Sequence, residues 1–481
     1  MMRRTKIICT IGPATSSVEQ LEQLIIAGMN VARLNFSHGK HEEHGLVIER
    51  VRAISARLNI PVAILQDLQG PKIRVGSLQD GGPVTLVDGA HLTITTRDIL
   101  GTAQTISTTY KALPQDVKVG DRILLDDGLL ELRVVSFNET DVECVIVHGG
   151  HLGEHKGINL PGVVVSAPAL TEKDRDDLRF GVAHDVDYVA LSFVRTPQDV
   201  LDAKAYLQQV QEELKDKDEH SPIPLIAKIE KPEAVGHLDA ILAVVDGAMV
   251  ARGDLGVEMA LEKVPLIQKR IIARCNALGL PVITATQMLE SMVTNPRPTR
   301  AEVNDVANAV IDQTDAVMLS AETSVGAYPI ESVKVMVRIA QEIESSKRVT
   351  QQPQRDQISK AQAVSDAARA LAEETSVKAI VVLTRSGLSA QLISKDRPRT
   401  PIFAYTPSMQ VYRRLPLWWG VKSHLVSISG NTEELIGAVE KRLLDDQLVQ
   451  KGDHVVIIGG LPIGSRARTN FVKLHQVGND M

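Results

Sequence analysis

Lysine, arginine and carboxylate side chains stand at the ends of several short β-rich runs in this 481-residue sequence. One run ends in Lys228 and Glu230, and another carries Arg33, Asn35 and Ser37 at alternate positions. Because alternate side chains of a strand share a face, each set would point the same way. Fixed cations stabilise the charge that develops during group transfer, and carboxylates bind divalent metals. These residue types therefore indicate metal-dependent chemistry on an anionic substrate.

Further polar residues end other runs at the equivalent place. Asp67 ends the third run, Thr286 ends the seventh, and Glu322 follows Ser320 at the end of the eighth. A single residue of this kind would more often be a surface charge or part of a structural ion pair. Convergence from several strands favours one active site at their carboxyl ends.

A glycine-containing turn follows the sixth run, at residues 249–256. If this turn opens a short helix, its free N–H groups can bind an anion, and Gly253 permits close approach of a ligand. Asp254 adds a hard oxygen ligand. Asp254 and Glu230 together would hold one Mg²⁺ or Mn²⁺, because such ions are usually bound by one or two carboxylates plus substrate oxygens and water.

The elements that must position these residues alternate between β-rich runs and longer amphipathic stretches. This alternation is typical of parallel strands joined by crossover helices. Eight strands are predicted, and eight is the number of a (β/α)8 TIM barrel. They lie at residues 6–11, 30–36, 62–67, 188–193, 225–230, 248–251, 282–286 and 316–320. The α/β fold class follows, with the active site expected at the mouth of the barrel.

Two other regions interrupt or follow this pattern. Asp-Gly and Gly-Asp dipeptides between about residues 71 and 168 are typical of tight turns, and predict an inserted small β-barrel domain that could act as a lid. A polar stretch at 351–356 predicts a linker, and runs at 378–383, 401–404 and 454–458 predict strands of an open α/β domain. The predicted domains are a catalytic barrel at 1–70 and 169–348, a lid at 71–168 and a regulatory domain at 356–481.

Composition excludes several classes of protein. The net charge is −6 and no basic stripe of the kind that tracks nucleic acid is present. No apolar run approaches the ~20 residues that span a bilayer, and the first residues lack the apolar core of a secretion signal. Cys9, Cys144 and Cys275 lie too far apart in sequence for a disulfide framework or close-spaced metal ligands. We expect a cytoplasmic protein with reduced thiols that binds neither nucleic acid nor membranes.

Five stretches of the sequence resemble the pyruvate kinase family, in order along nearly the whole chain. They are Thr-Ile-Gly-Pro-Ala at 10–14, Arg-Leu-Asn-Phe-Ser-His-Gly at 33–39, Lys-Ile-Glu at 228–230, Ala-Arg-Gly-Asp-Leu-Gly at 251–256 and Ala-Thr-Gln-Met-Leu-Glu-Ser-Met at 285–292. The resemblance implies transfer of a phosphoryl group from phosphoenolpyruvate to ADP, giving pyruvate and ATP in the final step of glycolysis. It also implies a homotetramer.

The resemblance assigns catalytic roles to matching positions. Lys228 is similar to the lysine that stabilises the phosphoryl group in flight, which suits a transition state rich in charge. Arg33 matches the arginine that grips phosphoryl oxygens in fork geometry. Glu230 and Asp254 resemble the divalent-metal ligands.

Substrate and nucleotide contacts are implied in the same way. The amides near Gly253 and Asp254, together with Thr286, would hold the substrate carboxylate. Thr286 would lie near the carbon that takes a proton after transfer, either as the donor or as a residue that orders water. Arg74 and Lys156, at the two edges of the inserted domain, resemble nucleotide-phosphate contacts that form when the lid closes.

The monovalent-cation site departs from the family pattern. Asn35, Ser37, Asp67 and the carbonyl of Leu68 match K⁺ ligands of many members, and Asn35 also matches a nucleotide contact. Those members read Asp-Thr-Lys-Gly-Pro-Glu where residues 67–72 read Asp-Leu-Gln-Gly-Pro-Lys, so Lys72 replaces a glutamate. A tethered ammonium is worth about 4 kcal/mol against a unit anion at roughly 4 Å and an effective dielectric near 20. We predict activity without K⁺; the alternative is that Lys72 points to solvent.

Hydroxyls and glycine just after a strand of the C-terminal region predict a phosphate-binding loop. Its residues are Thr384, Arg385, Ser386, Gly387 and Ser389. In the family this loop, with a second at 464–466, binds a phosphorylated activator. We expect activation by a sugar phosphate or a nucleotide monophosphate; the alternative is a plain helix cap.

Two other functions fit parts of the pattern. A metal-dependent aldolase or lyase acting on pyruvate or phosphoenolpyruvate would share Glu230 and Asp254, but it would not need Arg33, Lys228 and a lid together. A non-catalytic sensor of phosphorylated metabolites would tolerate a broken active site, whereas the positions for phosphoryl chemistry are intact. Residues 460–465 are glycine-rich but lack the lysine of a P-loop, which excludes that nucleotide site.

Overall fold

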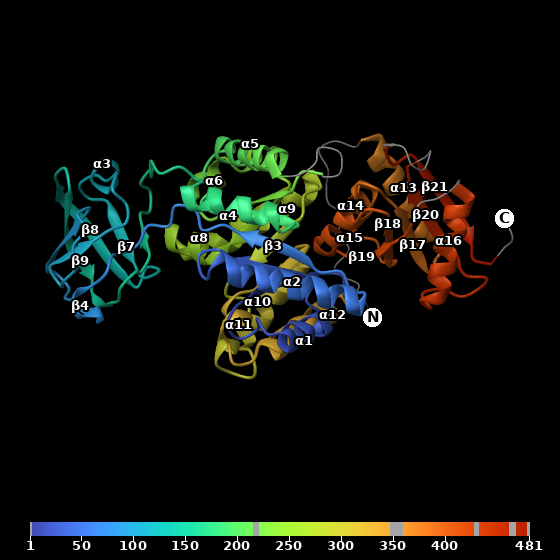
Figure 1. Cartoon of the computed structure of the whole chain (residues 1–481), viewed down its shortest axis with the longest axis horizontal. Helices are drawn as coiled ribbons and strands as arrows, with labels where there is room; N and C mark the ends of the chain where they lie inside the picture. Colours follow the sequence, from blue (N-terminus) through green and yellow to red (C-terminus); the bar gives the residue numbers. More distant parts are fainter. Residues whose placement is uncertain (1, 215–220, 347–358, 428–431, 461–467, 479–481) are drawn as a thin grey trace.

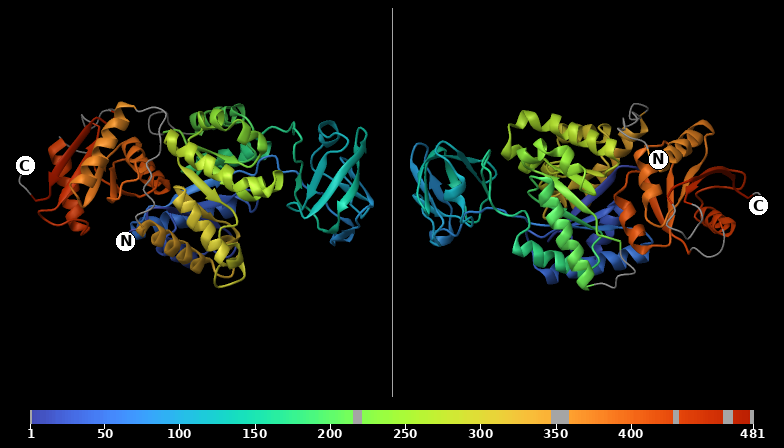
Figure 2. Two further views of the ribbon diagram at one scale, coloured as in Figure 1. Left: turned by 180° about the vertical axis from the view of Figure 1, so that it is seen from behind. Right: turned by 90° about the horizontal axis from the view of Figure 1, so that it is seen from above.

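The computed structural model describes residues 2–214, 221–346, 359–427, 432–460 and 468–478. Three regions lie in a row, with the inserted β region at one end, the barrel in the middle and the C-terminal region at the other end (Figures 1 and 2). The predicted linker at 351–356 and the second predicted effector loop at 464–466 lie outside the described residues.

A closed barrel of eight parallel strands forms the middle region, with the order β1-β16-β15-β14-β13-β12-β3-β2. The strands are β1 Lys6–Ile11, β2 Val31–Asn35, β3 Ala63–Asp67, β12 Tyr188–Leu191, β13 Leu225–Ile229, β14 Gly247–Ala251, β15 Val282–Ala285 and β16 Ala316–Leu319. All eight predicted strands are confirmed, with ends that differ by two residues at most. Both faces are largely apolar away from the carboxyl ends of the strands, as expected for a parallel sheet covered by helices.

Helices surround the barrel and cover the outer faces of its strands (Figure 1). They are α1 Val18–Ala27, α2 His41–Leu58, α4 Glu172–Ala183, α5 Pro197–Leu214, α6 Pro232–Gly236, α7 Leu238–Leu242, α8 Arg252–Glu258, α9 Val264–Leu278, α10 Arg300–Ile311, α11 Ala321–Ser324 and α12 Pro329–Ser345. Among the described residues, no helix is both long and apolar enough to cross a membrane. The three cysteines are buried and free, in agreement with the prediction.

The inserted region leaves the barrel after β3 and returns before α4. Its strands are β4 Val84–Leu86, β5 His91–Thr95, β6 Thr105–Ser107, β7 Arg122–Leu125, β8 Leu130–Phe137, β9 Asp141–His148, β10 Gly150–Leu152 and β11 Ile158–Asn159, with a short helix α3 Leu113–Asp116. Hydrogen bonds join them into a six-stranded sheet, β11-β7-β8-β9-β5-β6, and a two-stranded sheet, β10-β4. The region has its own hydrophobic core.

The C-terminal region is an open five-stranded sheet in the order β19-β18-β17-β20-β21, flanked by helices. Its strands are β17 Ala379–Leu383, β18 Ile402–Thr406, β19 Val421–Leu425, β20 His454–Gly459 and β21 Phe471–Gln476, and its helices are α13 Lys360–Glu374, α14 Leu388–Lys395, α15 Met409–Arg414 and α16 Thr432–Asp445. The three predicted strands are confirmed. The sequence analysis missed β19 and β21, which lie at the two edges of the sheet and carry more polar residues.

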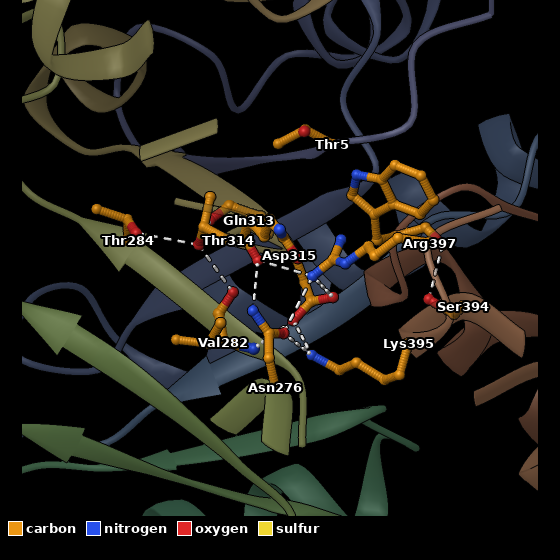
Figure 3. A network of polar contacts seen from close by, with 12 residues as sticks. Thr5, Asn276, Val282, Thr284, Gln313, Thr314, Asp315, Ser394, Lys395 and Arg397 are labelled. Atoms are coloured by element: carbon orange, nitrogen blue, oxygen red, sulfur yellow. Dashed lines mark hydrogen bonds and ion pairs between the residues drawn. The ribbon is translucent and has the colours of Figure 1, made fainter. Parts of the chain in front are cut away.

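A buried polar network joins the amino-terminal end of the barrel to the C-terminal region (Figure 3). Asp315, directly before β16, pairs with Lys395 (2.6 Å) at the end of α14 and with Arg397 (2.9 Å). Asn276 accepts hydrogen bonds from the same two cations. Leu417 of the C-terminal region packs with the residues that fill the barrel. The two regions therefore share a buried contact.

Candidate active site

Polar side chains gather at the carboxyl ends of the barrel strands, on the face that points into the barrel. Along β2, Val31 belongs to the barrel interior, and Arg33 and Asn35 follow at the same parity. Along β13, Ile226 lies in the interior and Lys228 follows two residues later. The alternation predicted from the sequence is thus present, and it brings residues distant in sequence to one end of the barrel.

Four charged residues form a buried cluster at this end. The Arg33 guanidinium donates from Nε to Asp67 Oδ2 at 2.6 Å. The Lys228 ammonium lies 3.3 Å from Asp67 Oδ1 and 2.8 Å from Glu230 Oε1. Asp67 and Glu230 are each 1% exposed, whereas Lys228 keeps 12% of its side chain accessible. The cations are therefore held by carboxylates but remain within reach of a ligand.

Burial and charge act in opposite directions on this cluster. Burial alone would lower the pKa of Lys228, but the carboxylates of Asp67, Glu230 and Asp254 outweigh it, so the pKa is raised. Burial alone would raise the pKa of Asp67, but Lys228 and Arg33 keep it below its usual value. For Glu230, burial prevails over Lys228 and raises the pKa. Lys228 therefore stays protonated, and the carboxylates of Asp67 and Glu230 that it faces are shielded from solvent.

A serine that the sequence analysis did not single out completes the cluster. Ser192 follows β12, is 1% exposed, and its Oγ lies 2.7 Å from the Lys228 ammonium. The next residue, Phe193, donates its backbone N–H to Glu230 Oε2 at 2.9 Å. The parity rule could have found Ser192, because Tyr188 and Ala190 at the same parity fill the barrel interior.

The turn after β14 opens α8 as predicted, and it lies against the end of β15. Thr286 Oγ1 accepts a hydrogen bond from the Gly253 amide at 2.8 Å and donates to the Ala285 carbonyl at 2.7 Å. Thr286 has a φ of +67°, a conformation that costs a β-branched residue energy and tends to persist at functional sites. Arg252 donates to the Thr286 carbonyl at 2.6 Å and pairs with Asp305, which holds this turn in place.

Glu230 and Asp254 are the residues that could hold a divalent cation. The charge of Asp254 acts on both Lys228 and Glu230, raising the pKa of each, so Asp254 lies close enough to the cluster to influence it. Among the described residues, no group of three or more His, Cys, Asp or Glu side chains could hold a metal. Two hard carboxylates that leave coordination positions to substrate and water match the way Mg²⁺ is usually bound, so the donor set fits this ion.

Glu322 does not join the cluster, although its position at the end of the eighth strand predicted that it would. Its carboxylate is completely buried and accepts hydrogen bonds from the backbone N–H groups of Ser320 (2.7 Å) and Leu289 (3.0 Å). Glu322 therefore links the two loops that follow β15 and β16, because a buried carboxylate needs hydrogen-bond donors for its oxygens.

The residues predicted for a monovalent site lie beside the cluster. Asn35 Oδ1 accepts from the Ser37 amide at 3.2 Å, and the Leu68 carbonyl accepts from Ser192 Oγ at 2.7 Å. Lys72 is half-buried and lines the cleft between barrel and inserted region, as Asp254 does. Burial, followed by the charges of Arg74, Lys72 and Arg33, lowers the pKa of His38.

Of the three predicted nucleotide contacts, Arg74 and Lys156 lie on the inserted region and Asn35 ends β2 of the barrel. Arg74 donates to the His155 carbonyl at 3.0 Å, and Lys156 pairs with Asp126 at 2.9 Å. Lys156 Nζ is thus committed to a carboxylate of its own region in this arrangement. A bond from Asn159 to Glu258 of α8 (2.9 Å) links the inserted region to the barrel.

The predicted effector loop joins β17 to α14 in the C-terminal region. Thr384 Oγ1 accepts from the Gly387 amide at 2.9 Å, and Gly387 takes a φ of +89° that suits glycine. Ser389 is buried and hydrogen-bonds Thr469 at 2.7 Å, whereas Arg385 and Ser386 are exposed. The loop has the compact turn expected for a phosphate site or for a helix cap.

Comparisons with known proteins agree with this geometry. The family model described as "Pyruvate kinase, barrel domain" matches residues 2–333, and "Pyruvate kinase, alpha/beta domain" matches 362–475. Pyruvate kinase from Geobacillus stearothermophilus is 47% identical over 485 residues, which cover 100% of this chain and 81% of the relative. Pyruvate kinase 2 from Synechocystis is 48% identical over 478 residues, covering 99% and 79%.

A solved structure leads to the same family. The crystal structure of a pyruvate kinase from Cryptosporidium parvum superposes with a TM-score of 0.90 at 38% identity, covering 99% of this chain and 96% of that one. Two family models, relatives matched over 99–100% of this chain and a structural match over 99% of it all name the same family. The chain belongs to the pyruvate kinase family.

Proposed function

We propose that the chain transfers the phosphoryl group of phosphoenolpyruvate to ADP with the charged cluster at the barrel mouth as its catalytic centre. The observation that carries this assignment is the Lys228 ammonium, held between Asp67 and Glu230 with Arg33 beside them. The bond from phosphorus to the enol oxygen breaks while a β-phosphate oxygen of ADP bonds to phosphorus. The breaking bond leaves its electron pair on the enol oxygen, and the phosphoryl group passes through a loose transition state with negative charge on its oxygens, so positioned cations supply most of the catalysis.

Lys228 and Arg33 would both bind the transferring phosphoryl group. Arg33 keeps its Nε on Asp67 and donates NH1 to Thr10 at 2.9 Å, so its fork is oriented before substrate arrives. Lys228 is a cation at every physiological pH because its pKa is raised. The pair would neutralise the equatorial oxygens during transfer.

The Gly253 and Asp254 amides and Thr286 would bind the substrate carboxylate at the start of α8. The enolate left after transfer must take a proton at its methylene carbon to become pyruvate. We assign Thr286 to this face, as the proton donor or as the residue that orders a water. Asn35, Arg74 and Lys156 would contact the nucleotide phosphates, which for Lys156 requires release from Asp126.

Glu230 and Asp254 would hold Mg²⁺ or Mn²⁺, which when bound draws charge from the phosphoryl oxygens. To test this, Glu230→Gln removes one charge at constant size. We expect kcat to fall by about 10²-fold or more and Mn²⁺ binding, followed by electron paramagnetic resonance, to weaken. Glu440→Gln in the C-terminal region should leave both quantities unchanged. Turnover of the Glu230 variant at the wild-type rate would contradict the assignment.

Lys72 would provide the charge that K⁺ supplies in other members. Its support is its position in the cleft and its effect, with Arg33, on His38. Wild-type protein assayed with tetramethylammonium in place of K⁺ should keep its activity, and Lys72→Glu should require K⁺. A strong K⁺ requirement in the wild type would overturn this role.

The loop at 384–389 would bind a phosphorylated activator in a homotetramer. A rate profile across sugar phosphates and AMP tests the first part, because a bound activator should raise the rate at low phosphoenolpyruvate, and Arg385→Ala should abolish the response. Light scattering of the purified chain tests the second. A flat profile would leave the loop a helix cap.

A further inference from the structure

The Lys228 ammonium occupies one of the oxygens that the proposed metal would need. It lies 2.8 Å from Glu230 Oε1, 2.7 Å from Ser192 Oγ and 3.3 Å from Asp67 Oδ1. A dication bound to the same oxygen would repel the ammonium at that distance and weaken their contact. Metal binding would therefore loosen Lys228 from Glu230.

Two partners remain to hold the ammonium once this contact is loosened. Asp67 is one, but its carboxylate is shared with Arg33, which takes Oδ2 at 2.6 Å. Ser192 is the other. It is neutral, so a metal on Glu230 does not compete for it, and its hydroxyl is the nearest atom to the ammonium.

The hydroxyl of Ser192 is oriented to accept a hydrogen bond from Lys228, because its own proton is already donated elsewhere. It donates its proton to the Leu68 carbonyl at the end of β3 at 2.7 Å, so its lone pairs are left for Lys228. At 1% exposure it has almost no access to bulk water as a competing partner. The adjacent Phe193 amide fixes Glu230 Oε2, so this two-residue segment orients both the lysine and the metal-binding carboxylate.

We propose that Ser192 is a positioning residue for phosphoryl transfer, which keeps the Lys228 ammonium in place once the metal has loosened it from Glu230. The inference rests on the proposed function. It predicts two separate effects when the hydroxyl is removed. First, the Lys228 ammonium is less well positioned for phosphoryl transfer. Second, it interacts more strongly with Glu230 and therefore competes with the metal for this carboxylate.

The test compares Ser192→Ala and Ser192→Thr with wild type. Loss of a hydrogen bond to a charged group predicts a fall in kcat of about 10- to 100-fold for Ser192→Ala. The KM for phosphoenolpyruvate should change much less, and Mn²⁺ binding measured by electron paramagnetic resonance in the substrate-free protein should weaken several-fold. Ser192→Thr keeps the hydroxyl and should restore both quantities.

A matched control separates this role from general packing. Ser423 is also buried and donates to a backbone carbonyl, that of Tyr412 at 2.8 Å, but it lies in β19 of the C-terminal region. Ser423→Ala should keep kcat and Mn²⁺ affinity. If Ser192→Ala does not fold, Ser192→Cys makes the same comparison, because sulfur is a weak acceptor.

The outcomes distinguish the inference from the function on which it rests. Wild-type kcat and Mn²⁺ affinity in Ser192→Ala would overturn it, and so would a loss of activity that Ser192→Thr does not restore. If the wild type shows no activity with phosphoenolpyruvate and ADP, the proposed function is refuted. The Mn²⁺ measurement would still report on the contact between Ser192, Lys228 and Glu230.

Discussion

The barrel carries a buried ion cluster at each of its two ends. The two clusters differ in whether a carboxylate oxygen is left without a hydrogen bond. At the carboxyl end, Lys228 and Arg33 meet Asp67 and Glu230. At the amino end, Lys395 and Arg397 meet Asp315 (Figure 3). In TIM barrels the first end carries catalysis and the second contributes stability.

Hydrogen bonding explains the division. At the amino end, Asp315 Oδ2 accepts from the Val282 amide (2.8 Å) and from Lys395, and Oδ1 accepts from Arg397, so both oxygens are used. At the carboxyl end, Asp67 Oδ1 has only its 3.3 Å ion-pair contact with Lys228 and no hydrogen bond among the described residues. Asp315 therefore has no oxygen left for a ligand, whereas Asp67 keeps one; among the described residues, Arg397 Nε and NH1 at the amino end are also buried without a hydrogen bond.

The pKa values of the two buried lysines shift in opposite directions, because burial and nearby charges are balanced differently around each of them. Burial lowers the pKa of Lys395 to about 8, because Asp315 offsets it only in part and Arg397 adds a like charge. Around Lys228, three carboxylates outweigh burial and raise the pKa. The balance between burial and nearby charges therefore sets the direction in which the pKa of each buried lysine moves.

The largest expected difference between the clusters is catalytic. Lys228→Met should lower kcat by about 10³-fold, because a cation aimed at the transferring group is lost. Lys395→Met should keep kcat within about threefold, because the amino end of the barrel does not meet substrate. Steady-state assays of both variants, with circular dichroism to verify folding, measure this contrast. Equal losses would remove the distinction between the two ends.

The second difference concerns stability. Asp315→Asn leaves two buried cations without a carboxylate and should cost about 3–5 kcal/mol in the free energy of unfolding. Asp254→Asn, at a half-buried position, should cost about 1 kcal/mol or less. Urea unfolding of the two variants makes the comparison. A tolerated Asp315→Asn would show that the interdomain network is dispensable.

The smallest expected effect is the pH dependence that Lys395 confers. Its pKa in the folded protein, about 8, lies below the ordinary 10.5. Between these values the unfolded chain holds a proton that the folded protein has released, so stability rises with pH and is lost again as pH falls through about 8. Relative to Lys395→Met, the wild type should therefore gain stability from pH 7 to pH 10 in urea titrations. A falling difference would reverse the sign of the assigned shift.

Much of this site was readable from sequence because strand parity is a local property. Arg33, Lys228 and Asp67 follow apolar residues of the same parity, and the barrel number fixed which ends converge. Ser192 obeys the same rule, but a serine carries no charge to draw attention to it.

The remaining features depend on how distant segments dock. The pairing of Asp315 with Lys395 joins residues 80 apart in sequence, and no local pattern indicates it. The same holds for the contact of Lys156 with Asp126, and for Glu322, whose position at a strand end resembles that of a catalytic carboxylate although its oxygens bind backbone amides. Polar composition hid β19 and β21 at the sheet edges.

The most direct test follows phosphorus through the reaction. Purified wild-type protein, phosphoenolpyruvate, ADP and Mg²⁺ in tetramethylammonium buffer can be monitored by ³¹P nuclear magnetic resonance. The account predicts that the phosphoenolpyruvate signal disappears as the γ-phosphate signal of ATP appears in equal amount. Release of inorganic phosphate instead, or no change even after K⁺ is added, would contradict phosphoryl transfer by this cluster.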